Sequence, residues 1–213
     1  MHDQAKGRLW RSALLALAVA CATPEQARKP PPTTASATPV EAVPRQAQLV
    51  PFQGKAGFTV LMPPTPYESE RTESTPGGAV HVHLAQAHSE MAKYLASVSD
   101  FPKGSLDRIP ESDLLDSLQQ STIQSMHGTL VASRNIEVAG LRGREFSATD
   151  PEGSEVTARI LLGDSRVYTV AGTYPKGAIP ATVHQFLDSF QPTATAAVST
   201  SGASVGPERP ASR

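Results

Sequence analysis

Two histidines at alternate positions are the first residues of this sequence whose type and spacing could support chemistry. His81 and His83 alternate with valines, so in a β-strand both imidazoles would lie on one face. Two imidazoles can bind zinc, but a firm site needs a third ligand, for which the chain offers His88, His127 and His184. No HExxH motif or cysteine cluster accompanies them. We therefore expect the pair to cover the solvent-exposed face of an amphipathic strand, without a metal.

Two short motifs admit a functional interpretation and a structural one. The turn containing Asp150, Glu152 and Glu155 could hold a hard cation weakly, but the ligand spacing of an EF-hand is absent. The triplet Gly163-Asp-Ser165 resembles part of a hydrolase motif. A nucleophile elbow, however, needs G-x-S-x-G at a strand-to-helix turn, and this triplet falls at an expected hairpin tip. We predict solvated turns and no catalytic residue.

Three arginines could form an anion-binding patch if they shared one face of a sheet. Arg142, Arg144 and Arg159 lie in two neighbouring expected strands. Cross-strand pairing with Glu145 or Glu155 is the interpretation that we favour, because opposite charges on facing strands attract. Neither a P-loop nor a G-x-G-x-x-G motif occurs, so we expect no cofactor.

The composition describes a modest folded core diluted by polar segments. The chain has 213 residues with a formal net charge of −1, and it is 39% hydrophobic and only 5% aromatic, with 19 Pro and 15 Gly. A near-neutral charge argues against a nucleic-acid binder, which usually presents a basic face. The single cysteine excludes a disulfide framework and a cysteine-based zinc cluster. No apolar run is long enough for a membrane-spanning helix.

The first twenty residues have the layout of a secretory signal. A basic region with Lys6, Arg8 and Arg11 precedes the apolar stretch 13–20, which is too short to span a bilayer. We therefore predict a signal peptide at 1–20, to be removed before the fold is considered.

The only cysteine follows this apolar stretch directly. The sequence Ala18-Val-Ala-Cys21 resembles the lipobox of bacterial lipoproteins, and that resemblance implies lipidation of Cys21. The usual leucine is replaced by Ala18, so cleavage by an ordinary signal peptidase, releasing a soluble protein, remains the alternative. A lone cysteine in an exported protein otherwise needs an explanation.

Beyond Cys21 the chain divides into a tether, a domain and a tail. Residues 22–51 contain seven prolines and no aromatic residue, which predicts a lipidated, Pro-rich disordered tether at 21–51. A Pro-rich docking ligand is the alternative for this segment. All aromatics after Trp10 lie between Phe52 and Phe190, so we expect one folded domain at 52–192, with 11 basic and 16 acidic residues and a net charge of −5. A disordered tail should follow at 193–213.

Within the domain, period-two alternation dominates. It predicts strands at 58–62, 67–74, 79–87, 130–138, 141–149, 156–162 and 167–173. The segment 91–99 fits a helix or a strand, and we prefer a strand. Apolar stripes predict helices at 112–127 and 179–190. Turns of hairpin length indicate an antiparallel sheet, and the amphipathic helices must cover it, which is the α+β fold class.

Five stretches carry a resemblance to a known family. They are the segments at 58–66, 94–102, 140–146, 162–168 and 186–190. Together they resemble the PsbP-like fold, named for an extrinsic photosystem protein, and the chain resembles uncharacterised bacterial exported lipoproteins with such a domain. The resemblance covers most of 55–191 and implies an α/β/α sandwich, a curved antiparallel sheet with helices on both sides. Its motifs are structural, so it implies no catalytic residue and no photosystem contact.

These features favour a lipid-anchored, non-enzymatic binding or scaffolding module of the bacterial cell envelope. Its partners would be the membrane, through the lipid on Cys21, and an envelope protein or small ligand, but no nucleic acid. Ala22 stands where an aspartate would favour the inner membrane, which predicts the periplasmic face of the outer membrane. The alternative is a soluble exported hydrolase or metal-binding enzyme, which would need a cleft with convergent titratable groups.

Overall fold

The computed structural model describes residues 48–177 and 179–193. The expected signal peptide, Cys21, most of the tether and the tail beyond Thr193 lie outside the described residues. The division of the chain into signal, tether, domain and tail therefore stays a prediction.

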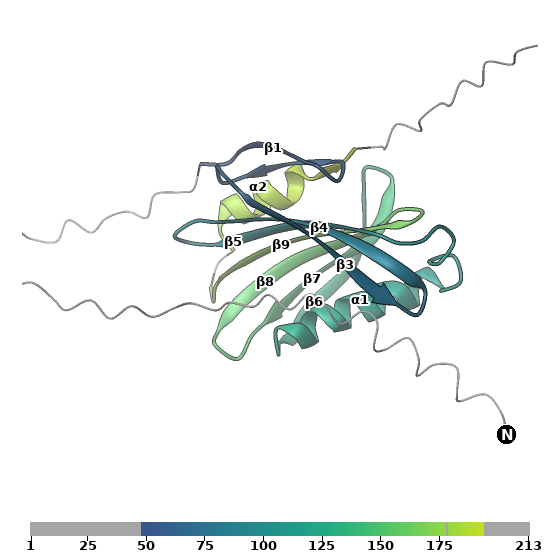
Figure 1. Cartoon of the computed structure of the whole chain (residues 1–213). Coiled ribbons are helices and arrows are strands. Elements are labelled where there is room, and N and C mark those ends of the chain that lie inside the picture. Colours follow the sequence, from purple (N-terminus) through teal and green to yellow (C-terminus); the bar gives the residue numbers. More distant parts are fainter. Residues whose placement is uncertain (1–47, 178, 194–213) are drawn as a thin grey trace, which may run out of the picture.

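Two antiparallel sheets and two helices make up the described part of the chain (Figure 1). The strands are β1 (Val50–Gly54), β2 (Phe58–Met62), β3 (Tyr67–Thr75), β4 (Gly78–His88), β5 (Lys93–Asp100), β6 (Thr129–Val138), β7 (Leu141–Thr149), β8 (Ser154–Leu162), β9 (Arg166–Pro175) and β10 (Gln191–Pro192). The helices are α1 (Glu111–Ser125) and α2 (Ala181–Ser189).

The larger sheet has seven strands in the order β3-β4-β5-β9-β8-β7-β6. Every neighbouring pair is antiparallel, as the hairpin-length turns predict. The chain leaves the sheet after β5, forms α1, and enters again at the far edge as β6. Strands β7, β8 and β9 then follow side by side, and β9 pairs with β5, which joins the two halves of the sheet.

The two helices lie on opposite faces of this sheet (Figure 1). Helix α1 contacts β7 and β8, and its Leu114 and Leu115 are buried against Phe146 and Ile160. Helix α2 packs between β9 and β2 of the small sheet, burying Phe186 in the larger hydrophobic cluster. Apolar residues at helical spacing bury one stripe of each helix in this way.

Helix α2 approaches β9 at a glycine. A Cβ added to Gly172 would lie 2.4 Å from Cγ1 of Val183, which is fully buried. Because a real Cβ needs well over 3 Å of separation from such an atom, the glycine allows the helix to sit close to the sheet.

The expected fold class, α+β, is confirmed by a mostly antiparallel sheet with two helices. The ambiguous segment at 91–99 is a strand, as preferred, because it pairs with β4 and β9 on both sides. Neither helix in the described part of the chain has the length and apolar character needed to cross a bilayer.

A small three-stranded sheet, in the order β1-β2-β10, is the part of the fold that was not expected. Strand β1 begins at Val50, two residues before the expected start of the domain, and contains Pro51. Proline cannot donate to a ladder and is confined to edge strands, and β1 is the edge of this sheet. Pro51 is therefore compatible with a strand at this edge, although it makes the strand hard to recognise in the sequence.

Candidate functional site

A groove over the small sheet is a concave surface lined by described residues of β1, β2 and the end of α2. It is open to solvent and has a volume of about 480 Å³, which is within the range of ligand sites, roughly 300–1,000 Å³. We call it the hairpin groove. Its lining residues are Pro51, Phe52, Gln53, Thr59, Val60, Leu61 and Ser189.

The hairpin that forms this groove is held in place by aromatic packing. The turn between β1 and β2 has Gly57 at φ +84°, a conformation that L side chains rarely adopt. A Cβ on Gly54 would lie 2.3 Å from the ring of Phe58, so this ring packs directly over the backbone of β1. Phe58 also lies 5.7 Å from Phe190, ring centre to ring centre. The hairpin is thereby fixed to the end of α2.

The lining of the hairpin groove is uncharged. The described residues that line it carry no ionisable side chain, and their polar groups are the hydroxyls of Thr59 and Ser189 and the amide of Gln53. The Ser189 hydroxyl donates to the Phe186 carbonyl at 2.8 Å and accepts from the Leu61 N–H at 2.8 Å. Both bonds are made to backbone groups, so the Ser189 hydroxyl holds the end of α2 against β2. The groove offers apolar surface and a few hydrogen-bonding groups, which suits binding.

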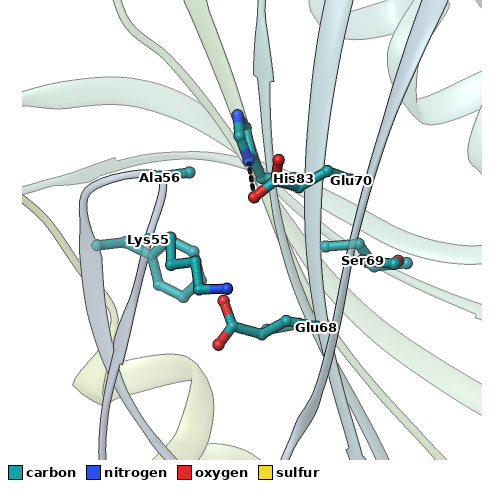
Figure 2. Close-up of a pocket in the computed structure, with 9 residues that line it drawn as sticks. Lys55, Ala56, Glu68, Ser69, Glu70 and His83 are labelled. Atoms are coloured by element: carbon teal, nitrogen blue, oxygen red, sulfur yellow. Dashed lines mark ion pairs between the residues drawn. The ribbon is translucent and has the colours of Figure 1, made fainter.

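The two histidines of β4 differ in their exposure to solvent. His81 is exposed, with its Nδ1 3.0 Å from the Thr72 hydroxyl, as expected for a solvent-facing residue. The expectation fails for His83, whose side chain is only 27% exposed. The reason is that the turn of the β1–β2 hairpin covers this end of the face, which was expected to be open (Figure 2).

His83 lies between two carboxylates. Its Nδ1 is 3.4 Å from Glu70 Oε1, and its Nε2 is 3.8 Å from Asp100 Oδ2. These are ion-pair distances without hydrogen-bond geometry, so the buried Nδ1 atom has no hydrogen-bond partner among the described residues. Beside it is a cavity of about 10 Å³, enough for about one water molecule. Lys55 points toward Glu68 across the same cavity (Figure 2).

Arg166 joins this cluster to the hairpin. Its Nε donates to Asp100 at 2.5 Å, and its Nη1 donates to the carbonyl of Ala56 in the hairpin turn at 3.2 Å. Burial by itself lowers the pKa of Arg166, but the hydrogen bonds and charges of Tyr168 and Asp100 outweigh it, so the pKa lies above its usual value. Arg166 therefore stays charged and fastens the turn to the large sheet.

Within the described ranges, no three metal-binding side chains lie close enough to share an ion. The third ligands considered from the sequence are dispersed, since His88 ends β4, His127 follows α1 and His184 belongs to α2. The two ring nitrogens of His83 also point to different carboxylates.

We expect zinc to leave the melting temperature of the protein unchanged, because a ligand raises it only by binding the native state. Differential scanning fluorimetry of the wild type and of the double variant His81→Gln, His83→Gln measures this. An upward shift that disappears in the double variant would establish a zinc site.

The two turn motifs have structural roles. The Asp150 carboxylate accepts from the backbone N–H groups of Glu152 and Ser154, at 3.0 and 2.7 Å, and so shapes the β7–β8 turn. The Gly163 N–H donates to the Arg166 carbonyl at 2.8 Å, which closes the hairpin between β8 and β9. The triplet therefore occupies a hairpin tip, as expected.

The three arginines do not share a face, so the anion-binding patch considered from the sequence does not form. Arg142 pairs with Glu111 at 2.8 Å, and Arg144 pairs with Asp116, both on α1. Arg159 donates to Glu145 at 2.7 Å on the opposite face. The cross-strand pairing that was favoured is therefore confirmed for Arg159 and is wrong for Arg142 and Arg144, which pair with the helix instead. Side chains alternate along a strand, and the register places Arg159 directly across from Glu145.

Arg159 is the centre of a network that ties the sheet to α2. It also donates to the Leu187 carbonyl and to Asp188, both at 2.7 Å, while Arg134 donates to the same Glu145 carboxylate. Burial alone would raise the pKa of Glu145, but hydrogen bonds from Arg159 and Arg134, and then their charges, outweigh it and lower the pKa below its usual 4.5. The network is a structural one.

We expect Arg159→Met to lower the free energy of unfolding at pH 7 by about 2 kcal/mol, because it leaves partly buried acceptors without their donor. Arg134→Met is the matched control on the same carboxylate. Arg134 is 69% exposed and Arg159 only 12%, so the control should change stability by about 0–1 kcal/mol. Because the pKa of Glu145 is lowered on folding, its ionised form stabilises the fold at pH values above 4.5. This contribution is lost as the pH falls through the folded-state pKa. Urea unfolding at a series of pH values from 7 to 3 measures this. The difference in unfolding free energy between the wild type and Arg159→Met should become smaller below pH 4.5, and a difference that stays constant would contradict the prediction.

The hairpin groove was missed in the sequence because its two walls are far apart in the chain. Ser189 lies 128 residues from Leu61, to which it is hydrogen-bonded. The available signal was the apolar stretch Leu49–Phe52, which alternates poorly around Pro51. Only the pairing of β1 with β2 places Phe52 opposite Val60.

Comparison with known proteins gives structural neighbours and no family. No family model matches the chain, and no curated protein matches it in sequence. The solution structure of cyanobacterial PsbP (CyanoP) from Synechocystis sp. PCC 6803 is similar with a TM-score of 0.47 at 12% identity, over 74% of this chain and 98% of that one. A crystal structure from Bacteroides thetaiotaomicron VPI-5482 matches with a TM-score of 0.35 at 12% identity, over 70% of this chain and 50% of that one. Neither likeness assigns the chain to a family.

Proposed function

We propose that this protein is a lipid-anchored, non-enzymatic binding module of the bacterial cell envelope. Cys21 would carry the lipid on the periplasmic face of the outer membrane, and the folded domain would bind an uncharged, extended peptide segment of an envelope protein in the hairpin groove. We further propose that the domain is a PsbP-like α/β/α sandwich. Helices on opposite faces of the sheet support this.

The chemistry of the hairpin groove is the observation that carries the binding role. Phe52 and Leu61 are half-buried there, so each still has apolar surface to offer a ligand, whereas Gln53 and Thr59 are exposed and can hydrogen-bond to one. A site of this kind fixes a ligand by apolar contact and a few polar groups. A peptide in the polyproline conformation matches it well, because its carbonyls have no internal partners.

A peptide titration followed by nuclear magnetic resonance tests this proposal. The probe is a capped, uncharged peptide that repeats Pro-Thr-Pro-Pro-Val twice, added to the isotope-labelled mature chain. We expect the backbone amides of Gln53, Thr59 and Leu61 to shift progressively. A control peptide with glutamate in place of each threonine should bind more weakly, because the groove offers no charge to neutralise it.

Matched variants show whether the shifts report the groove. Thr59→Lys places a charge in the lining and should abolish binding, whereas Ser74→Lys, also at an exposed strand position but on β3, should leave it intact. Shifts confined to other surfaces, or equal binding of both peptides, would overturn the assignment of the groove.

A further inference from the structure

We propose that the hairpin groove is also a binding site for the chain's own segment Pro30–Val40, which would compete in cis with an external peptide. This inference rests on the proposed function, because it names a regulator of the same groove.

The place where the described chain begins supports this proposal. Strand β1 enters the fold at Val50, which pairs with Met62, and the next pair is Pro51 with Leu61. Both members of that second pair line the groove. The chain that precedes Gln48 therefore joins the domain at the end of the groove itself.

The connecting chain is long enough for the segment to reach back. Residues 41–47 separate Val40 from Gln48, and an extended chain of that length spans about 20 Å at roughly 3.1 Å per residue. A five-residue strand such as β1 is about 17 Å long. The segment can thus turn and run along the full length of the hairpin.

The chemistry of the segment matches the lining. Residues 30–40 contain four prolines and no charged residue, while Lys29 and Glu41 flank them directly. The uncharged stretch would lie in the uncharged groove and leave both flanking charges in water. Proline rings can pack on Pro51 and Leu61, and the free carbonyls of a polyproline helix can accept from Gln53 and Thr59 on the same face.

Docking in cis would have two consequences. A short connection gives an effective concentration in the millimolar range. Even a weak intramolecular contact would therefore keep external peptides of low affinity out of the groove. It would also shorten the tether between Cys21 and the domain, and a tight external partner would lengthen it again.

Paramagnetic relaxation enhancement on the mature chain tests this proposal. In a Cys21→Ser background, a nitroxide on Ala35→Cys should broaden the amides of Gln53, Thr59 and Leu61 selectively. The control label is on Ala203→Cys, which is separated from the described domain by a similar length of chain. The broadening should vanish when Thr59→Lys is added or when residues 30–40 are replaced by glycine and serine.

The same replacement of residues 30–40 should tighten binding of the external peptide, because the internal competitor is gone. Broadening spread evenly over the surface, or equal from both labels, would overturn cis docking. If the external peptide still binds in that case, the proposed function stands without it. If neither the label nor the peptide reports the groove, both fail.

Discussion

Gly143→Ala is expected to destabilise the domain by more than about 3 kcal/mol, near the upper end of single-substitution effects. A Cβ at Gly143 would lie 2.0 Å from the carbonyl oxygen of Ile160 and 2.8 Å from Cδ2 of Leu161. The first of these atoms belongs to the backbone of β8, which is held on its other side by β9. No side-chain rotation can relieve such an overlap, so the ladder between β7 and β8 must separate locally.

Gly163→Ala is the matched control for this substitution. Its added Cβ would make ordinary contacts of 3.6–3.7 Å with Tyr168 and Arg166, so we expect a change within about 0.5 kcal/mol. Urea unfolding monitored by circular dichroism measures both variants. Equal midpoints for the two alanines would show that β7 and β8 do not approach as closely as the structure has them.

The inner strands were predictable because buried and more exposed residues alternate along them. Val80 and Val82 are buried and His81 is exposed, so the period of two is legible in the sequence. Gly143 shows the limit of this reasoning. The pattern identifies the strand that contains it, but the need for glycine comes from a neighbour seventeen residues later in the chain.

Which charged residues meet was predictable only in part. The sequence places Arg144, Glu145 and Arg159 in adjacent strands, but the register decides that Arg159 faces Glu145 while Arg144 faces α1. A shift of one residue would reverse these faces. Sequence patterns fix the alternation along each strand and leave such a shift open.

The groove and the covered His83 share one cause for having been missed. Both depend on the β1–β2 hairpin folding over the end of the large sheet. The proline in β1 hid the first strand, and β10 is only two residues long. Neither carries a periodic signal, so their positions follow from tertiary packing against Phe190 and Arg166.

Cys21→Ala is expected to move the whole protein from the membrane fraction to the soluble fraction. The prediction rests on the lone cysteine directly after the apolar stretch 13–20. Each buried CH₂ of an acyl chain contributes about 0.8 kcal/mol, and stable anchoring takes two chains or more, so loss of the modified residue removes the entire attachment. Fractionation of cells expressing each form, with mass spectrometry of the mature N-terminus, measures this.

Ala22→Asp is the control, because it leaves Cys21 in place and should keep the protein on a membrane. An unmodified N-terminus at Ala22 or Thr23 in the wild type would contradict lipidation and favour the soluble alternative. The charge of the domain makes the test decisive. Residues 52–192 carry a net charge of −5, which anionic lipids repel rather than attract. A domain of this net charge adds no overall electrostatic attraction to such a surface, so we expect the attachment to depend on Cys21.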